Sequence, residues 1–177
     1  VEFPDVPSYR QNLSGGYCML AKVLQLQHGH EKLVEAEQAV LSALAIQQSL
    51  VSDFPSNAHS RRLLADSHAV LSENRKRASR IDEARQEQLK AASLLEELAT
   101  EFPDVPDDRN ELATVYWWLA QLYLHPESEQ WLRKALILNE KLAADFPAVT
   151  EYRYELLKSL FSLGIVSLNN NHTADAE

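Results

Sequence analysis

Glycine is scarce in this chain, with 4 Gly in 177 residues. Glycine supplies positive-φ turns and the loops that cradle phosphates, and no Gly-rich phosphate loop is present. Residues that favour helices, namely Ala, Leu, Glu, Gln and Arg, fill the periodic stretches instead. No segment alternates apolar and polar residues as a strand would. We therefore predict an all-α fold.

Cysteine and basic charge are also in short supply. The single cysteine, Cys18, excludes a disulfide within the chain, and we expect it to be a small buried hydrophobe. Lys and Arg number 17 against 26 Asp and Glu, for a net charge of -9, which argues against a nucleic-acid partner. No apolar run of about 18 residues and no signal-like segment occurs. We therefore expect a soluble segment without a membrane span and favour a cytoplasmic location.

A Phe-Pro pair recurs four times and divides the chain into units. The pairs are Phe3-Pro4, Phe54-Pro55, Phe102-Pro103 and Phe146-Pro147, at intervals of 51, 48 and 44 residues. Repeats of this length are typical of stacked helical units, none of which buries its apolar face alone. We predict one repeat domain over 1–177, with units at approximately 3–53, 54–101, 102–145 and an incomplete 146–177. We expect the later three Phe rings to be largely buried.

The positions around each Phe repeat as well. In all four copies an Arg follows the Phe by seven residues, and Leu residues follow it by ten and by seventeen. The three later Phe are directly preceded by an acid, with a Leu four residues before and an Ala eleven before. These separations are helical. They predict seven helices in antiparallel hairpins, at 8–27, 31–52, 57–77, 80–100, 107–124, 127–144 and 150–169.

Small and bulky residues alternate in a fixed pattern within each unit. The first helices carry Tyr17-Leu20-Ala21-Leu24, His68-Leu71-Ser72, Tyr116-Leu119-Ala120-Tyr123 and Leu160-Leu163-Gly164. The second helices carry Ala36-Val40-Ala43, Ala84-Gln88-Ala91 and Ser128-Leu132-Ala135. This pattern resembles the tetratricopeptide repeat over essentially the whole chain. The resemblance implies a right-handed superhelical array of hairpins, with a concave face lined by the first helices.

The second helix departs from the family pattern because it is about two turns longer. The last small Ala and the linker Pro are twelve residues apart, for example Ala43 and Pro55, where the family has about five. The Phe-Pro linker, with the Tyr152-Arg153-Tyr154-Glu155-Leu156 sequence, resembles helical-repeat regions attached to large bacterial serine/threonine kinases. The chain starts at Val1, and 173–177 resembles the opening turn of an eighth helix. We therefore interpret it as a fragment of a longer protein.

The sequence lacks motifs for catalysis and cofactor binding. It has no kinase catalytic motif and no nucleophile elbow, so any kinase domain would lie outside this segment. His28 and His30 flank a glycine, but without two further ligands at matching spacing they do not predict a metal site. We predict no enzyme activity, cofactor or metal here. The basic segment 75–80, which contains Ser79, is interpreted as an exposed turn, with a docking patch or a phosphorylation site as the alternative.

The repeated Arg is the most regular polar feature. An Arg near a helix start opposes the helix dipole, so we expect a specific partner to offset that cost. The repeated acid before each Phe is the obvious candidate, which would place an ion pair across the linker. The predicted pairs are Asp53 with Arg61, Glu101 with Arg109 and Asp145 with Arg153, preceded by Glu2 with Arg10. The alternative is a ladder of Arg residues that grips an acidic ligand.

The concave face implied by the resemblance lacks the paired Lys and Asn of carboxylate-clamp members, so we expect no such clamp. Aromatic residues dominate interface energetics when they are exposed in a groove. The candidate partner-binding groove comprises Trp117, Trp118, Gln121, Lys158 and Phe161. Because adjacent helical residues point about 100° apart, at least one Trp should be partly exposed. The alternative is that the Trp side chains belong to the core.

These observations favour a non-catalytic scaffold that binds a protein or peptide partner within a larger bacterial signalling protein. A regulatory repeat region of a serine/threonine kinase is the first alternative, and a structural spacer whose groove binds nothing is the second. The exposed terminal repeats also offer a surface through which two copies could form a dimer.

Overall fold

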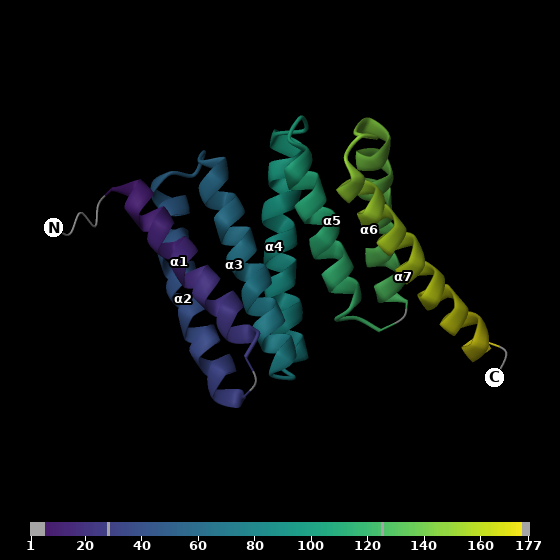
Figure 1. Ribbon diagram of the computed structural model, residues 1–177, viewed down its shortest axis with the longest axis horizontal. Helices are drawn as coiled ribbons and strands as arrows, with labels where there is room; N and C mark the ends of the chain where they lie inside the picture. The colour runs from purple at the N-terminus through teal and green to yellow at the C-terminus, as the bar shows by residue number, and fades with distance from the viewer. Residues whose placement is uncertain (1–5, 28, 125, 175–177) are drawn as a thin grey trace. The chain divides into compact units, whose positions relative to one another are not determined.

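The computed structural model describes residues 6–27, 29–124 and 126–174. Within these ranges the chain forms seven α-helices and no strand (Figure 1). The helices are α1 (Pro7–Gln25), α2 (His30–Asp53), α3 (Ala58–Arg77), α4 (Ile81–Glu101), α5 (Pro106–Ala120), α6 (Glu127–Asp145) and α7 (Thr150–Ala174). The expectation of an all-α fold with seven helices is confirmed.

Two helix ends differ from the predicted ones by more than two residues. Helix α5 ends at Ala120, four residues before the predicted end at 124, where the N–H groups of Gln121 and Leu122 bond to the carbonyls three residues earlier, of Trp118 and Leu119, at 3.1 and 2.9 Å. Helix α7 continues to Ala174, past the predicted end at 169, because no Pro or Gly follows Gly164 to stop it. Thr173 and Ala174 therefore belong to α7 and do not open an eighth helix. Residues 175–177 lie outside the described ranges.

The helices group into two compact units, 1–98 and 99–177, with the boundary in the last turn of α4. In the first unit α1 packs against α2, and α2 against α3. The core between these helices is built mainly from small side chains: Ala21 of α1 and Ala36, Val40 and Ala43 of α2 are fully buried, with Leu71 of α3 beside them. Alanine and valine allow the helix backbones to approach closely, so the helices are held by dense packing.

In the second unit α6 packs against both α5 and α7. Leu119 of α5 and the α6 residues Leu132, Ala135 and Leu142 are completely or almost completely buried. Tyr152 of α7 is also buried, and its ring lies 5.8 Å from the ring of Phe146 in an edge-to-face arrangement. Burial of such side chains is the main source of stability for a helical domain of this size.

Each described Phe-Pro pair makes the same backbone turn. The carbonyls of Phe54, Phe102 and Phe146 accept hydrogen bonds from the N–H groups three residues later, at 3.0, 3.1 and 3.0 Å. Phe54 and Phe146 also donate their own N–H groups to the carbonyls of Leu50 and Leu142 at 2.9 Å, which closes the preceding helix. The following Pro disfavours helical backbone at the Phe, so the motif ends one helix and aims the chain at the next.

The expectation that these Phe rings are largely buried is wrong for Phe54. Phe54 is 42% exposed, and Phe102 and Phe146 are only half-buried; Phe3 lies outside the described residues. The buried anchor is instead the Leu four residues earlier, because Leu50, Leu98 and Leu142 are each 0% exposed. The helix turns this Leu inward, whereas Phe54, which follows the last turn of α2, lies at the surface.

This arrangement predicts different costs for two truncations one turn apart. We expect Leu50→Ala to lower the free energy of unfolding by about 2–5 kcal/mol, since it leaves a cavity in a packed core. We expect Phe54→Ala to cost less than half as much, because the ring already contacts water. Urea denaturation followed by circular dichroism measures both. Equal losses for the two variants would contradict the assignment of Leu50 as the anchor.

Candidate interaction surface

Trp117 of α5 lies against α7 in the second unit. Its indole Nε1–H donates a hydrogen bond of 2.9 Å to the hydroxyl of Ser162. The Lys158 ammonium, one turn before Ser162, lies 4.9 Å from the centre of the Trp117 ring and is ion-paired with Glu155. The Trp117 side chain is half-buried. These contacts fix the ring and satisfy its only polar group, which leaves part of a rigid aromatic surface open to solvent.

Trp118 extends this aromatic group. The rings of Trp117 and Trp118 meet edge to face, with centroids 5.1 Å apart and planes at 81°. Both side chains are half-buried, in agreement with the expectation for adjacent helical residues. Gln121 follows Trp117 by one helical turn and is exposed. The neighbouring indoles and the exposed amide therefore form one edge of α5.

The structure brings together only part of the predicted groove. Trp117 and Lys158 are in contact, and Ser162 joins them as a hydrogen-bond acceptor. Phe161 does not join them: its side chain is 71% exposed, and it follows the buried Ser159 by two residues, which is about 200° around the helix. Phe161 therefore belongs to the face of α7 that is turned away from α6.

The corresponding positions of the first unit are polar. Lys22 of α1 and Asp66 of α3 form an ion pair at 2.9 Å. Beside them, the Cys18 thiol lies 2.9 Å from the hydroxyl of Ser67, and burial raises the pKa of that thiol. Cys18 is thus a buried small residue, as expected. The ion pair is exposed on both sides, so it supplies little free energy and offers no apolar surface to a partner.

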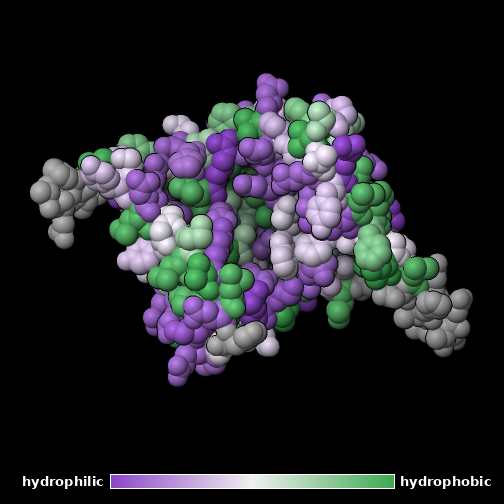
Figure 2. All heavy atoms as spheres, viewed as in Figure 1, coloured by the Kyte–Doolittle hydropathy of each residue, from purple (hydrophilic) through white to green (hydrophobic). Residues whose placement is uncertain are grey.

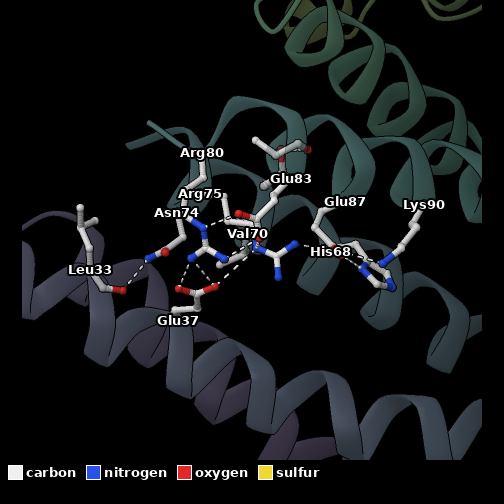
Figure 3. A network of polar contacts seen from close by, with 12 residues as sticks. Leu33, Glu37, His68, Val70, Asn74, Arg75, Arg80, Glu83, Glu87 and Lys90 are labelled. Carbon is white, nitrogen blue, oxygen red and sulfur yellow. Dashed lines mark hydrogen bonds and ion pairs between the residues drawn. The ribbon is translucent and has the colours of Figure 1, made fainter. Parts of the chain in front are cut away.

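A buried acid lies at the centre of a polar network in the first unit (Figure 3). The Glu87 carboxylate of α4 is bound by three side chains: His68 Nδ1 at 2.6 Å, Arg75 Nη1 at 2.9 Å and Lys90 Nζ at 2.8 Å. Because a carboxylate only accepts, His68 Nδ1 carries the hydrogen of this contact. The side chains of His68 and Glu87 are 7% and 6% exposed. Burial of both partners favours a structural role for this pair.

Glu37 of α2 links the same network to the turn before α4. Arg80 Nη1 lies 2.7 Å from Glu37 and Arg80 Nη2 lies 2.6 Å from Glu83, while Arg75 Nε lies 3.4 Å from Glu37 (Figure 3). Arg77, in the last turn of α3, pairs with Glu73 and donates to the carbonyl of Gln25. The Arg residues of the basic segment 75–80 are thus neutralised by acids of the same unit. Ser79 lies at the turn with a positive φ of 62° and is exposed.

The network sets the charge of Glu87. Burial alone would raise the pKa of Glu87, but hydrogen bonds from His68 and Lys90 outweigh it and lower the pKa to about 2. A carboxyl whose pKa is depressed on folding stabilises the folded state above its unfolded pKa of about 4.3. This stabilisation is lost as the pH falls through about 4 towards the folded value of about 2.

We therefore expect Glu87→Gln to reduce the free energy of unfolding at neutral pH by on the order of 3 kcal/mol, since it leaves Arg75 and Lys90 facing a neutral amide. The difference between wild type and variant should shrink between pH 5 and about pH 2.5, as the wild type loses its own carboxylate. Denaturant titrations across this range measure the difference. The matched control is Glu97→Gln, an exposed position on the same helix. A difference that stays constant with pH would contradict the role given to Glu87.

The repeated Arg residues pair in a different register from the predicted one. Arg10 Nη1 lies 2.8 Å from Asp53, and Arg109 Nη1 lies 3.3 Å from Asp145. The start of α1 therefore lies beside the end of α2, and the start of α5 beside the end of α6. The prediction that Asp53 and Asp145 reach forward across the Phe-Pro linker to Arg61 and Arg153 is wrong in this respect, because packing within a helix pair offers a closer Arg.

The other residues of the predicted ion pairs differ in burial and in contacts. Arg109, the predicted partner of Glu101, is the one that contacts Asp145. Arg61 is buried and Arg153 is exposed. Arg10 contacts Asp53 and Ser49, and its predicted partner Glu2 lies outside the described residues.

Two further sequence predictions concern metals and membranes. No group of three or more His, Cys, Asp or Glu side chains is placed to hold a metal ion in the part of the chain that the structure describes. His30 begins α2 and is exposed, while His28 lies outside that part. None of the described helices combines the length and the apolar character that crossing a bilayer requires.

Neither a scan against protein-family models nor a search of the curated proteins finds a match for this chain.

Proposed function

We propose that this chain is a non-catalytic tetratricopeptide-like module that binds a protein or peptide partner as part of a larger bacterial signalling protein, such as one that carries a serine/threonine kinase domain. The observation that supports the proposal is the aromatic edge of α5, where Trp117 is held by Ser162 and Lys158 and lies against Trp118. This edge is the proposed contact, with Gln121 at its exposed margin.

The chemistry of this edge suits binding. Trp is among the residues that contribute most to interface free energy, and a ring already fixed by neighbours loses little conformational entropy when a partner arrives. Lys158 is neutralised by Glu155, so covering it does not bury an unpaired charge. In the proposed array this edge lies on the concave face, which is lined by the first helix of each hairpin.

Photo-crosslinking tests this function. A photo-crosslinking amino acid replaces Gln121 in one protein and, as a matched control, Ile137 of α6, which is 65% exposed in the same unit. Both proteins are irradiated in a lysate of the source organism, and adducts are identified by mass spectrometry. We expect adducts with a defined partner at position 121 and few at position 137, because only the first position adjoins the aromatic edge.

Competition makes the test specific. Excess wild-type chain should abolish the adducts at position 121, whereas the Trp117→Ala/Lys158→Ala double variant should compete poorly while its circular dichroism spectrum remains helical. Equal competition by the double variant would contradict the proposed contact. Equal yields of adducts at positions 121 and 137 would instead support a structural spacer.

A further inference from the structure

Helix α7 has an apolar face that no described helix of its unit covers. Six large apolar side chains lie on this face, and all of them are at least 44% exposed: Tyr154, Leu157, Leu160, Phe161, Ile165 and Leu168. Figure 2 shows hydrophobic atoms along α7 in the same place. Monomeric soluble domains rarely leave so many large apolar residues together in water, so this face points to an association surface.

The packing of α7 in the unit shows that this face is distinct from the one bound to α6. Asn139 of α6 donates hydrogen bonds to the Ser159 hydroxyl at 2.9 Å and to the carbonyl of Glu155 at 3.3 Å. Tyr152 and Ser159 on this side are buried. With about 100° per residue, Leu157 and Phe161 lie about 160° from Ser159 and Leu168 about 180° from it. The apolar face is therefore opposite the α6 contact and does not include Ser162, which binds Trp117.

This face also differs from the equivalent face of the earlier helices. The position eleven residues after each Phe is Ser14 in α1, Ala65 in α3 and Ala113 in α5, and all three are buried. In α7 the same position is Leu157, which is exposed. A helix that packs as closely as α2 packs on α1 would meet a large side chain here. The face thus needs an occupant of different shape from the second helices of this chain.

A second copy of α7 has the required shape. If two copies pack in antiparallel fashion about a two-fold axis between residues 162 and 163, Phe161 of one copy meets Gly164 of the other. The same register joins Leu157 to Leu168 and Leu160 to Ile165. Gly164 is exposed, with no atom within 4 Å of an added Cβ, so it provides a notch for the large Phe161 ring. Because the two-fold axis relates the two copies, the contact of Phe161 with Gly164 occurs twice, and the surface of α7 is complementary to itself.

The area of the apolar face of α7 and the charges beside it are compatible with a second copy of α7. Six large apolar side chains from each copy, at on the order of 100 Å² apiece, bury roughly 1,200 Å², the lower limit for a stable interface. In this register Lys158 lies opposite Ser167, so it meets no like charge. We propose that the chain forms a dimer through antiparallel packing of α7 against α7. The dimer face excludes Trp117 and Ser162, but it borders Lys158, which lies about 20° from Ile165 around α7.

The dimer is tested by sedimentation equilibrium of the wild-type chain and three variants. We expect the wild type to dimerise with a Kd below about 100 µM, and Phe161→Ala to weaken it at least about tenfold. Gly164→Leu adds apolar surface and favours helix, yet it fills the notch and should also weaken the dimer at least about tenfold. Ile137→Ala, on α6, should leave the Kd unchanged. A monomeric wild type, or a Gly164→Leu variant that dimerises as well as the wild type, would overturn the proposal.

Disulfide crosslinking tests the orientation independently. In the antiparallel register, a Leu160→Cys chain mixed with an Ile165→Cys chain should form a mixed disulfide faster than either chain forms one with itself. Crosslinking mainly between identical Leu160→Cys chains would indicate parallel packing and would overturn the proposed register. Circular dichroism of each variant confirms that the helices are retained, and Cys18 is buried and does not compete.

Discussion

Close packing between neighbouring helices is the interaction on which the rest of this structure depends. It rests on alanines with no exposed surface, among them Ala21, Ala36, Ala43, Ala91 and Ala135. Because these side chains are small, the backbones approach closely, and the larger Leu side chains interdigitate beside them. The same packing brings Arg10 to Asp53 and Arg109 to Asp145. The ion pairs are therefore consequences of the helix packing and not its cause.

Much of the fold could be predicted because helix periodicity and proline are strong local signals. The helices lie close to the predicted ranges, and the Phe-Pro pairs end α2, α4 and α6 as their backbone chemistry requires. The burial of Phe54 and the partner of Asp53 could not be predicted in the same way. A repeated apolar residue can be needed to form a turn and not to fill the core. The partner of an ion pair depends on which helices pack side by side, and the sequence alone does not give that tertiary information.

The candidate surface was predictable only in part, for a similar reason. Trp117 and Lys158 were expected on one face and are in contact, whereas the Phe161 side chain is 71% exposed and lies on the outward face of α7. The buried network around Glu87 was not predicted. Its signal in the sequence was the polar His68 and Arg75 at positions where other units carry apolar residues, which identifies an irregular unit but not the acid that joins them.

The most direct test of this account enlarges one alanine in the core between α1, α2 and α3. Ala43 is completely buried there, whereas Ala45 on the same helix is exposed. Ala43→Leu should lower the free energy of unfolding by about 1–3 kcal/mol because it forces the helices apart. Ala45→Leu should change it by no more than about 0.5 kcal/mol. Denaturant unfolding measures both, and an Ala43→Leu variant as stable as the wild type would contradict the central role of close helix packing.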